Sequence, residues 1–339
     1  MTVGSSAGVV RVGVVGAGIM GADHARQLAR FVSGAEVVLL ADPDLQRAKA
    51  AADAVGSEAL DDPFALVASS EVDAVVIASP DPTHPALVRA CVAAGKPVLC
   101  EKPLSPTLAD SAALIEDLGA DASLVSLGFM RRFDPGYTDL RATIVSGALG
   151  APVTVHSTGR GVSSGPGATS ESAVTNSAVH DLDIVAWLLD SPVVEVSWQA
   201  PRQASGVAFA DPQLILLRTE DGVLSTVDMF LNARYGYDVR CEVVGETGTA
   251  SLREPARTEV DSQLSRGLAY AADWRPRFAE AYRLELQAWV DQLGGGDGGP
   301  LASAHDGLVA SAVADAVIAS MHSDGARVRV QVPAVGSAQ

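Results

Sequence analysis

The chain has 339 residues, of which 48% are hydrophobic and 19% charged, and this composition excludes intrinsic disorder. A single hydrophobic core rarely grows beyond ~250–300 residues, so we expect two domains. The net charge of -17 argues against nucleic-acid binding, because such a surface repels phosphates. The sequence contains no stretch of ~18 uncharged apolar residues and no signal-peptide pattern at its start, so we expect no membrane span and a cytoplasmic location.

The first part of the chain alternates between short apolar runs and helix-like stretches. Strands are expected over residues 9–15, 36–41, 72–78, 97–100 and 124–129. Helices are expected over residues 22–31, 45–55, 86–94 and 106–118. Strands and helices that alternate with short loops predict a parallel, doubly wound α/β sheet.

The pattern changes after residue 130. The expected order is a helix over 137–146, a strand over 153–157, a Gly- and Ser-rich loop over 159–167 and a helix over 177–189. Strands without regular intervening helices follow at 193–199, 213–219, 223–232 and 238–245, and late helices at 278–293 and 308–321. Consecutive strands joined by turns indicate an antiparallel sheet. The sequence therefore predicts a nucleotide-binding domain over 8–129 and an α+β domain over 130–333.

A Gly-x-Gly-x-x-Gly motif at Gly16, Gly18 and Gly21 follows the first predicted strand and opens the first predicted helix. The first glycine permits a tight turn, the second lets the backbone approach a pyrophosphate, and the third lets the helix pack on the strand. The helix N-terminus supplies N–H groups for the anion. Asp42 ends the next strand, 21 residues after Gly21, where a carboxylate would bind the ribose hydroxyls.

The residues after the second strand bear on the choice of cofactor. Asp42 is followed by Pro43 and Asp44, so an adenosine 2′-phosphate would meet two carboxylates. This arrangement favours NAD over NADP. Arg47 lies one helical turn further on and would favour NADP, but its helical phase predicts that it points into solvent.

Glu101-Lys102-Pro103 directly follows a predicted strand, at the carboxyl edge of the sheet, where open α/β folds bind ligands. Lys102 is one of three lysines in the chain, and its ammonium can stabilise charge that develops on a substrate oxygen. A surface lysine before a helix is the alternative interpretation.

A second candidate pair, Asn176 and His180, lies four residues apart, so on a helix the two share one face. Histidine suits proton transfer near neutral pH, and oxidation of an alcohol releases a hydroxyl proton. His180 is therefore the candidate general base, and a structural histidine is the alternative.

The other histidines and the cysteines give weaker signals. His84 follows the third predicted strand and is expected to line the cofactor crevice. Four histidines have no convergent partners in the sequence: His24, His156, His305 and His322. The cysteines, which lie far apart, are Cys91, Cys100 and Cys241. The sequence therefore predicts neither a disulfide framework nor a metal site.

Together, residues 16–21, Glu101-Lys102-Pro103 and the helix that carries His180 resemble the Gfo/Idh/MocA oxidoreductase family. Longer stretches are similar to its inositol dehydrogenase branch, at residues 128–137, 211–213, 235–246 and 273–291. The resemblance implies a Rossmann domain and an α+β domain whose open, mainly antiparallel sheet mediates a homo-oligomer, a tetramer or dimer. It also implies NAD and oxidation of a cyclic polyol, with myo-inositol to 2-keto-myo-inositol (scyllo-inosose) as the leading activity.

The resemblance also implies roles for individual residues. Lys102 would contact the reacting hydroxyl, His180 would act as general base, and Asn176 would position the ring. The residues expected to bind the cofactor are Gly16, Gly18, Ile19, Met20, Gly21, Asp42, Ser79, His84, Glu101 and Lys102. Further substrate contacts are expected from Arg131, Tyr235 and Tyr237, with Trp274 near the same pocket across a subunit boundary. Core packing is the alternative for the aromatic residues.

Two departures from the family pattern concern the substrate. The inositol branch usually has Asp at the position of Asn176, and loss of that charge is expected to lower the basicity of His180. Either the activity optimum then moves to higher pH or the substrate differs. Gly159 and Gly161 stand where the branch tends to place polar side chains. The alternatives are therefore a dehydrogenase or ketone reductase of a modified cyclitol or sugar, and a non-catalytic dinucleotide sensor.

Overall fold

The computed structural model describes residues 8–252, 259–262 and 264–335, and these form two compact units. Of these described residues, 8–133, 280–309 and 333–335 belong to the first unit, and those within 134–279 and 310–332 belong to the second. The chain thus returns to the first unit late in its course, which the periodicity of the late helices did not indicate. None of the described helices is both long and apolar enough to span a bilayer.

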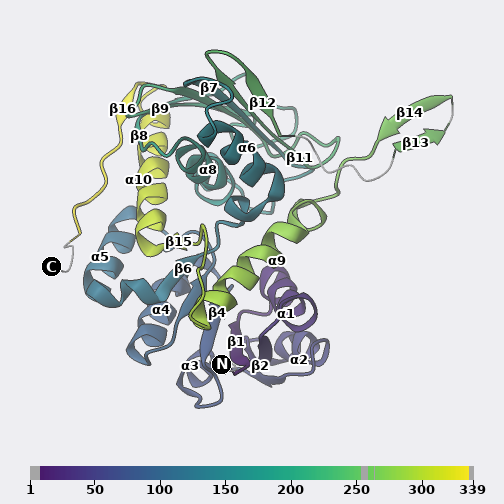
Figure 1. The fold of residues 1–339 in the computed structure, drawn as a ribbon, viewed down its shortest axis with the longest axis vertical. Coiled ribbons are helices and arrows are strands. Elements are labelled where there is room, and N and C mark those ends of the chain that lie inside the picture. The colour runs from purple at the N-terminus through teal and green to yellow at the C-terminus, as the bar shows by residue number, and fades with distance from the viewer. Residues whose placement is uncertain (1–7, 253–258, 263, 336–339) are drawn as a thin grey trace, which may run out of the picture. The chain divides into compact units, whose positions relative to one another are not determined.

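The first unit is built on a seven-stranded sheet with the order β15-β6-β5-β4-β1-β2-β3 (Figure 1). Its strands are β1 Val10–Val15, β2 Ala35–Ala41, β3 Glu58–Leu60, β4 Ala74–Ile77, β5 Val98–Cys100, β6 Val125–Leu127 and β15 Ala302–Ser303. Its helices are α1 Ile19–Phe31, α2 Leu45–Asp53, α3 Pro63–Ala68, α4 His84–Ala93 and α5 Leu108–Leu118. Strands β1 to β6 are parallel and β15 is antiparallel. This is the doubly wound order, so the expected Rossmann architecture is confirmed.

The sequence forms this sheet because its strands are continuous apolar runs, which a parallel sheet covered on both faces requires. Val12 and Val14 of β1 are fully buried, and Leu28 of α1 packs in the same core. The long helix α9, Trp274–Leu293, supplies Leu286 and Trp289 to this core. Trp289 is one of the largest fully buried side chains, so residues 280–293 are an integral part of the first unit.

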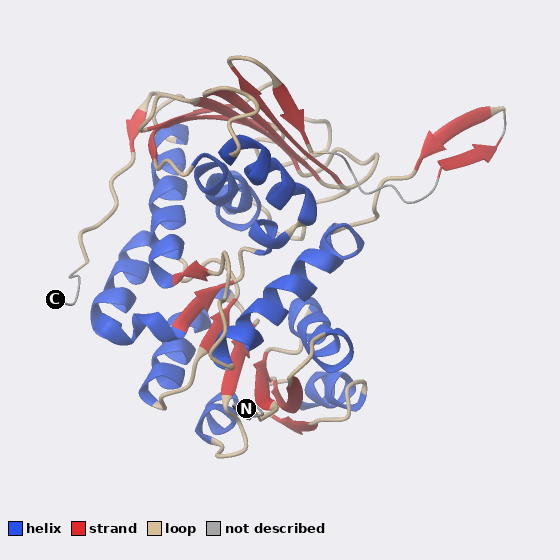
Figure 2. Ribbon diagram, in the orientation of Figure 1, coloured by secondary structure: helices blue, strands red, loops and turns tan. Residues whose placement is uncertain are grey.

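The second unit carries another seven-stranded sheet, with the order β12-β11-β7-β10-β9-β8-β16. Its strands are β7 Pro152–Arg160, β8 Val193–Gln199, β9 Gln213–Thr219, β10 Leu224–Phe230, β11 Asp238–Gly245, β12 Thr249–Ser251 and β16 Val328–Arg329. The hairpin of β13 Glu259–Ser262 and β14 Ser265–Leu268 stands apart from this sheet, and the helices of the unit are α6 Pro135–Val145, α7 Ser170–Ala173 and α8 Val179–Leu189. Figure 2 shows α6 and α8 beneath one face of the sheet. Within this sheet, each pair of neighbouring described strands is antiparallel except β7 with β10. The expected open, mainly antiparallel sheet is therefore confirmed.

Two local expectations were wrong. β7 continues through Gly159 and Arg160, which the sequence placed in a loop. Pairing with β10 on one side and β11 on the other holds this segment extended, and this outweighs the weak strand propensity of glycine. The short elements β3 and α3 between residues 58 and 68 were not expected, because segments of three and six residues carry too little periodicity.

The second unit begins with a buried ion pair. Asp134 is the N-cap of α6 and accepts hydrogen bonds from the N–H groups of Gly136 and Tyr137. Its other carboxylate oxygen lies 2.7 Å from the Arg277 guanidinium, and the two side chains are only 7% and 3% exposed. One carboxylate therefore both begins α6 and balances a buried cation.

We expect Asp134→Ala to lower the free energy of unfolding by about 3–5 kcal/mol, because it leaves the buried Arg277 charge without this partner. Urea unfolding of the full chain measures the loss. Asp261→Ala is the matched control, since its pair with Arg266 is exposed and should contribute less than about 1 kcal/mol. Equal losses in the two variants would contradict the structural role given to Asp134.

Candidate active site

The loop between β1 and α1 has the shape of a dinucleotide cradle. Gly16 has φ of +96°, and a Cβ there would lie 2.5 Å from the Ala78 carbonyl oxygen. A Cβ on Gly21 would lie 1.8 Å from the carbonyl oxygen of Gly16, so neither position accepts a side chain. At Gly18, by contrast, no other described atom would lie within 4 Å of a Cβ. Within the described residues no side chain caps α1, so its first N–H groups can take the pyrophosphate.

Asp42 stands at the end of β2 and is 5% exposed. Its carboxylate accepts hydrogen bonds from the N–H groups of Ala17 and Asp44, at 2.8 and 2.9 Å. Arg47 reaches back and pairs with it at 2.7 Å, so the expectation that Arg47 points away into solvent was wrong. Burial alone would raise the pKa of Asp42, but the Arg47 and backbone hydrogen bonds outweigh burial and lower it. The Asp42 carboxylate is therefore charged and already oriented.

Glu101 follows β5 and is buried beneath the backbone of Lys102. His24 of α1 donates from Nε2 to Glu101 Oε1 at 2.8 Å, and the Lys102 N–H donates to Oε2 at 3.2 Å. Burial would raise the pKa of Glu101, but the hydrogen bond from His24 and the charge of Lys102 lower it. A Cβ on Gly128 would come within 3.1 Å of this carboxylate, so a side chain there would crowd it. His24 thus has the convergent partner that the sequence did not reveal.

Ser79 and His84 lie in the loop after β4 and at the start of α4. The His84 ring is fully buried, with Nδ1 2.7 Å from the carbonyl oxygen of Pro103 and Nε2 2.9 Å from that of Ser79. The Lys102–Pro103 peptide bond is cis. His84 therefore joins the loop after β4 to the loop that carries Lys102, and direct contact between His84 and the cofactor stays a prediction.

Asn176 and His180 belong to the second unit. Asn176 lies in a π-helical turn over Val174–Ala178, which is closed by the hydrogen bond from the Val179 N–H to the Val174 carbonyl oxygen. His180 is in the first turn of α8 and is partly buried, whereas Asn176 is exposed. A π turn contains more residues than an α turn, so positions four apart come closer to one line along the helix. π turns of this kind often occur at functional sites.

The aromatic residues of the expected substrate site are tied into polar and ring contacts. The Tyr235 hydroxyl donates to Asp238 at 2.5 Å, and Asp238 also accepts two hydrogen bonds from Arg240. The Tyr235 ring meets Tyr270 edge to face, with 5.1 Å between centroids. Burial and the Asp238 carboxylate raise the pKa of Tyr235, so this hydroxyl stays protonated.

Tyr237 and Trp274 make further ring contacts in the same unit. Tyr237 packs edge to face on Phe278, with 6.3 Å between centroids, and its backbone bridges to Ala271. The Arg275 guanidinium lies 5.7 Å from the centre of the Trp274 ring. These contacts agree with the packing alternative without testing the substrate role.

The two glycines that depart from the family pattern differ in their surroundings. A Cβ on Gly159 would lie 3.5 Å from the Asp181 carboxylate, an ordinary contact distance. A Cβ on Gly161 would lie 2.8 Å from the Leu231 carbonyl oxygen, and the Gly161 N–H donates to Phe230. Gly159 therefore has room for a side chain, whereas Gly161 is held by close backbone packing.

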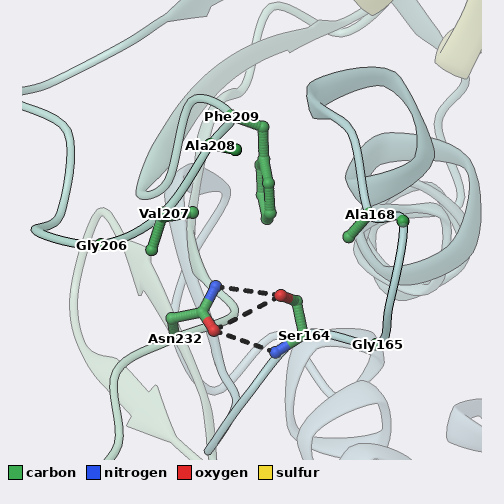
Figure 3. A pocket seen from close by; sticks show the side chains of 9 residues that line it. Ser164, Gly165, Ala168, Gly206, Val207, Ala208, Phe209 and Asn232 are labelled. Carbon is green, nitrogen blue, oxygen red and sulfur yellow. Dashed lines mark hydrogen bonds between the residues drawn. The ribbon is translucent and has the colours of Figure 1, made fainter.

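A pocket of about 190 Å³ lies in the second unit, and none of the expected site residues lines it. Its lining includes Ser164 and Asn232 on one side, and the Phe209 ring points into it from the other (Figure 3). Asn232 is held by Asp211, which also accepts the backbone N–H of Leu231. The Asp-Pro-Gln segment at 211–213 thus organises these loops.

The buried thiols are poorly suited to nucleophilic catalysis. Burial raises the pKa of Cys91 to about 12 and that of Cys100 well above its ordinary value. Thiolates are the reactive form, and these groups stay protonated. Among residues 8–252, 259–262 and 264–335, no three His, Cys, Asp or Glu side chains are grouped as a metal site needs.

Residues 10–129 match the family model described as "Oxidoreductase family, NAD-binding Rossmann fold", and residues 137–251 match the GFO/IDH/MocA C-terminal domain. The chain belongs to the Gfo/Idh/MocA family. It is 53% identical to inositol 2-dehydrogenase 2 of Paenarthrobacter aurescens, over 95% of this chain and 98% of the relative. It is 49% identical to inositol 2-dehydrogenase 1 of Saccharopolyspora erythraea, over 95% and 97%.

A solved structure shows the same fold over the whole chain. The myo-inositol dehydrogenase of Lactobacillus casei, in complex with NAD(H) and myo-inositol, superimposes with a TM-score of 0.90 at 31% identity. The match covers 97% of this chain and 99% of the other. The first unit is accordingly the NAD-binding Rossmann fold of a Gfo/Idh/MocA oxidoreductase, and its glycine cradle and Asp42 fit that cofactor.

The sequence did not reveal two residues that surround the Glu101 carboxylate. His24 contacts Glu101 across 77 positions, and Gly128 leaves the space that the Glu101 carboxylate fills. The available signal was the place of His24, one turn after Gly21 on a helix that packs on the sheet. Arg131 lies in the 3₁₀ turn Met130–Phe133 and is 4% exposed, so any substrate contact would use a largely buried guanidinium.

We expect Asp42→Asn to raise kcat/KM for NADP relative to NAD by at least about tenfold, because the loss of one charge near a 2′-phosphate is worth more than ~1.4 kcal/mol. The variant keeps its acceptor oxygen for Ala17 and releases Arg47 from its ion pair. Initial rates with both cofactors measure the change. The double variant Asp42→Asn/Arg47→Ala should lose most of the gain, and a gain that persists there would contradict the role given to Arg47.

Proposed function

We propose that this chain is an NAD-dependent dehydrogenase that oxidises myo-inositol to 2-keto-myo-inositol. The observation that carries the reaction class is the setting of Lys102, which follows β5 in the same unit as the glycine cradle, directly after the anchored Glu101. The substrate class is supported by the relatives named inositol 2-dehydrogenase and by the Lactobacillus casei structure with bound myo-inositol.

When bound, NAD supplies the nicotinamide carbon that accepts a hydride from the ring carbon. Lys102 donates a hydrogen bond to the oxygen on that carbon and stabilises the negative charge that develops there. His180 accepts the hydroxyl proton as general base. Asn176 positions the ring through a hydrogen bond from its amide to a neighbouring hydroxyl.

Other side chains contact the remaining hydroxyls of the substrate in this proposal. Arg131, Tyr235 and Tyr237 contact other hydroxyls of the ring, and Trp274 lies near the substrate of a neighbouring subunit. This last contact requires a homo-oligomer, a tetramer or dimer, which the family resemblance supports. We place the enzyme in the cytoplasm, and three buried thiols agree with a reducing compartment.

A modified cyclitol or related sugar is the second candidate substrate. The observation that favours it is the pair of glycines in β7 and just after it, because Gly159 and Gly161 offer no polar side chain to a hydroxyl. NADH formation with myo-inositol, scyllo-inositol, chiro-inositol and an aminocyclitol, together with ketone reduction, separates the candidates. Turnover of a modified ring without turnover of myo-inositol would identify the modified ring, and not myo-inositol, as the substrate.

We expect Lys102→Met and His180→Ala each to lower kcat/KM for myo-inositol by about 10²–10⁴-fold, since each removes a group that acts on the reacting hydroxyl. The control is His322→Ala, an exposed histidine paired with Glu171, which should retain wild-type kinetics. NADH formation measures all three. Wild-type turnover in both site variants would refute the mechanism.

The sign of the pH effect at position 176 follows from the role of His180. A carboxylate stabilises the imidazolium, so Asn176→Asp should move the acid limb of kcat/KM to higher pH by about 1–3 units. The expected shift of the wild-type optimum to higher pH has the opposite sign to this argument and stays a prediction, which the same pH profile tests. Rates from pH 5 to pH 10 measure the limb, and Asn176→Ser is the uncharged control. An unchanged acid limb in Asn176→Asp would contradict an electrostatic influence of position 176 on His180.

A further inference from the structure

Lys102 is flanked in the chain by two residues that are each bound by a buried histidine. His24, 1% exposed, binds the carboxylate of Glu101, the residue before Lys102. His84, fully buried, binds the carbonyl oxygen of Pro103, the residue after it. We infer that His24 and His84 are positioning residues that fix the backbone from which the Lys102 side chain extends.

The His24 contact is supported by ring packing and by the surroundings of Glu101. The His24 ring packs edge to face on Tyr282, with 5.7 Å between centroids, so its orientation is set by packing as well as by Glu101. Glu101 uses its second oxygen for the Lys102 N–H at 3.2 Å. Gly128 leaves the space for that carboxylate. The Glu101 carboxylate thus connects His24 of α1 to the backbone of Lys102.

The His84 contact acts from the other side. Its two ring nitrogens lie within hydrogen-bond distance of two carbonyl oxygens, those of Pro103 at 2.7 Å and Ser79 at 2.9 Å. Ser79 follows Ala78, whose carbonyl oxygen borders the Gly16 turn of the cofactor cradle. Both histidines therefore link the Lys102 loop to segments that border the cradle.

Such anchors matter because a lysine side chain is a flexible four-carbon stem that ends in a compact charge. Its ammonium can be placed accurately only if the backbone beneath it is fixed. A misplacement of about 1 Å at a reacting group can cost ~10²-fold in rate. The inference rests on the proposed role of Lys102 and adds the residues that hold it.

The test uses substitutions that keep one contact at a time. The amide nitrogen of Asn reproduces Nδ1 of histidine and that of Gln reproduces Nε2, so His84→Asn keeps the bond to Pro103 and His84→Gln keeps the bond to Ser79. His24→Gln keeps a donor for Glu101 and His24→Leu removes it. His322→Gln, at an exposed site, is the control.

The first readout does not depend on activity. The chain has three lysines, so acetylation of the cofactor-free protein with acetic anhydride can be followed at Lys102 and compared with the exposed Lys49 by peptide mass analysis. We expect the Lys102-to-Lys49 ratio to change several-fold in His84→Gln and His24→Leu, and to stay near wild type in His84→Asn, His24→Gln and the control.

The second readout is kinetic. In His84→Gln and His24→Leu, kcat for myo-inositol should fall by about 10–10²-fold. In His24→Leu, the dissociation constant of NADH, measured by its fluorescence, should stay within about threefold of wild type, well under the ~1.4 kcal/mol of a tenfold change. A structural role alone would affect His84→Asn and His84→Gln alike, or would lower NADH binding and thermal stability in parallel with kcat, and either result overturns the inference.

The experiments distinguish failure of the positioning role of His24 and His84 from failure of the proposed function of Lys102. If the acetylation ratio changes as expected but Lys102→Met retains full turnover, the positioning stands and the proposed function of Lys102 fails. If the ratio is unchanged in every folded variant, the positioning is refuted whatever the kinetics show. His24 and His84 are tested separately, so a variant that does not fold at one site leaves the other to decide.

Discussion

The buried carboxylate of Glu101 is the contact on which the first unit's site depends. A carboxylate removed from water is costly unless hydrogen bonds and charges compensate it. Here His24 and the Lys102 N–H donate hydrogen bonds to the carboxylate. The hydrogen bond from His24 and the positive charge of Lys102 lower the pKa of Glu101 although burial alone would raise it. Glu101 is therefore a charged anchor, and the loop after β5 cannot shift without breaking these contacts.

Glycines recur around the carboxyl ends of the strands because the chain packs closely there. Gly16, Gly21 and Gly128 each stand where a Cβ would press on a neighbouring backbone or on Glu101 itself. Gly18 differs, because a Cβ there would meet open space in the described structure. Three glycines thus allow close packing within the protein, whereas close packing does not require the fourth.

The sequence was a good guide to the fold because the fold depends on patterns that extend over many residues. The apolar runs of β1 and β4 and the strand spacing after residue 190 carry enough repeats to identify both sheets. Arg47 was misjudged because helical phase gives the direction of Cβ, whereas a long side chain can turn back to a carboxylate five residues earlier. The partnership of His24 with Glu101 depends on which strands are neighbours, and no local pattern contains that information.

The three positions that depart from the family pattern, Gly159, Gly161 and Asn176, differ in how closely the backbone packs around them. Gly161 lies so close to the Leu231 carbonyl oxygen that a side chain there would require the β10 end to move. Its lack of a polar group is therefore tied to local packing. A Cβ on Gly159 would have an ordinary contact distance to Asp181, and Asn176 is exposed in a π turn, so close backbone packing closes neither position to substitution. A difference in ring preference from the inositol branch is accordingly to be sought first at Gly159 and Asn176, where side chains can change while the backbone stays in place.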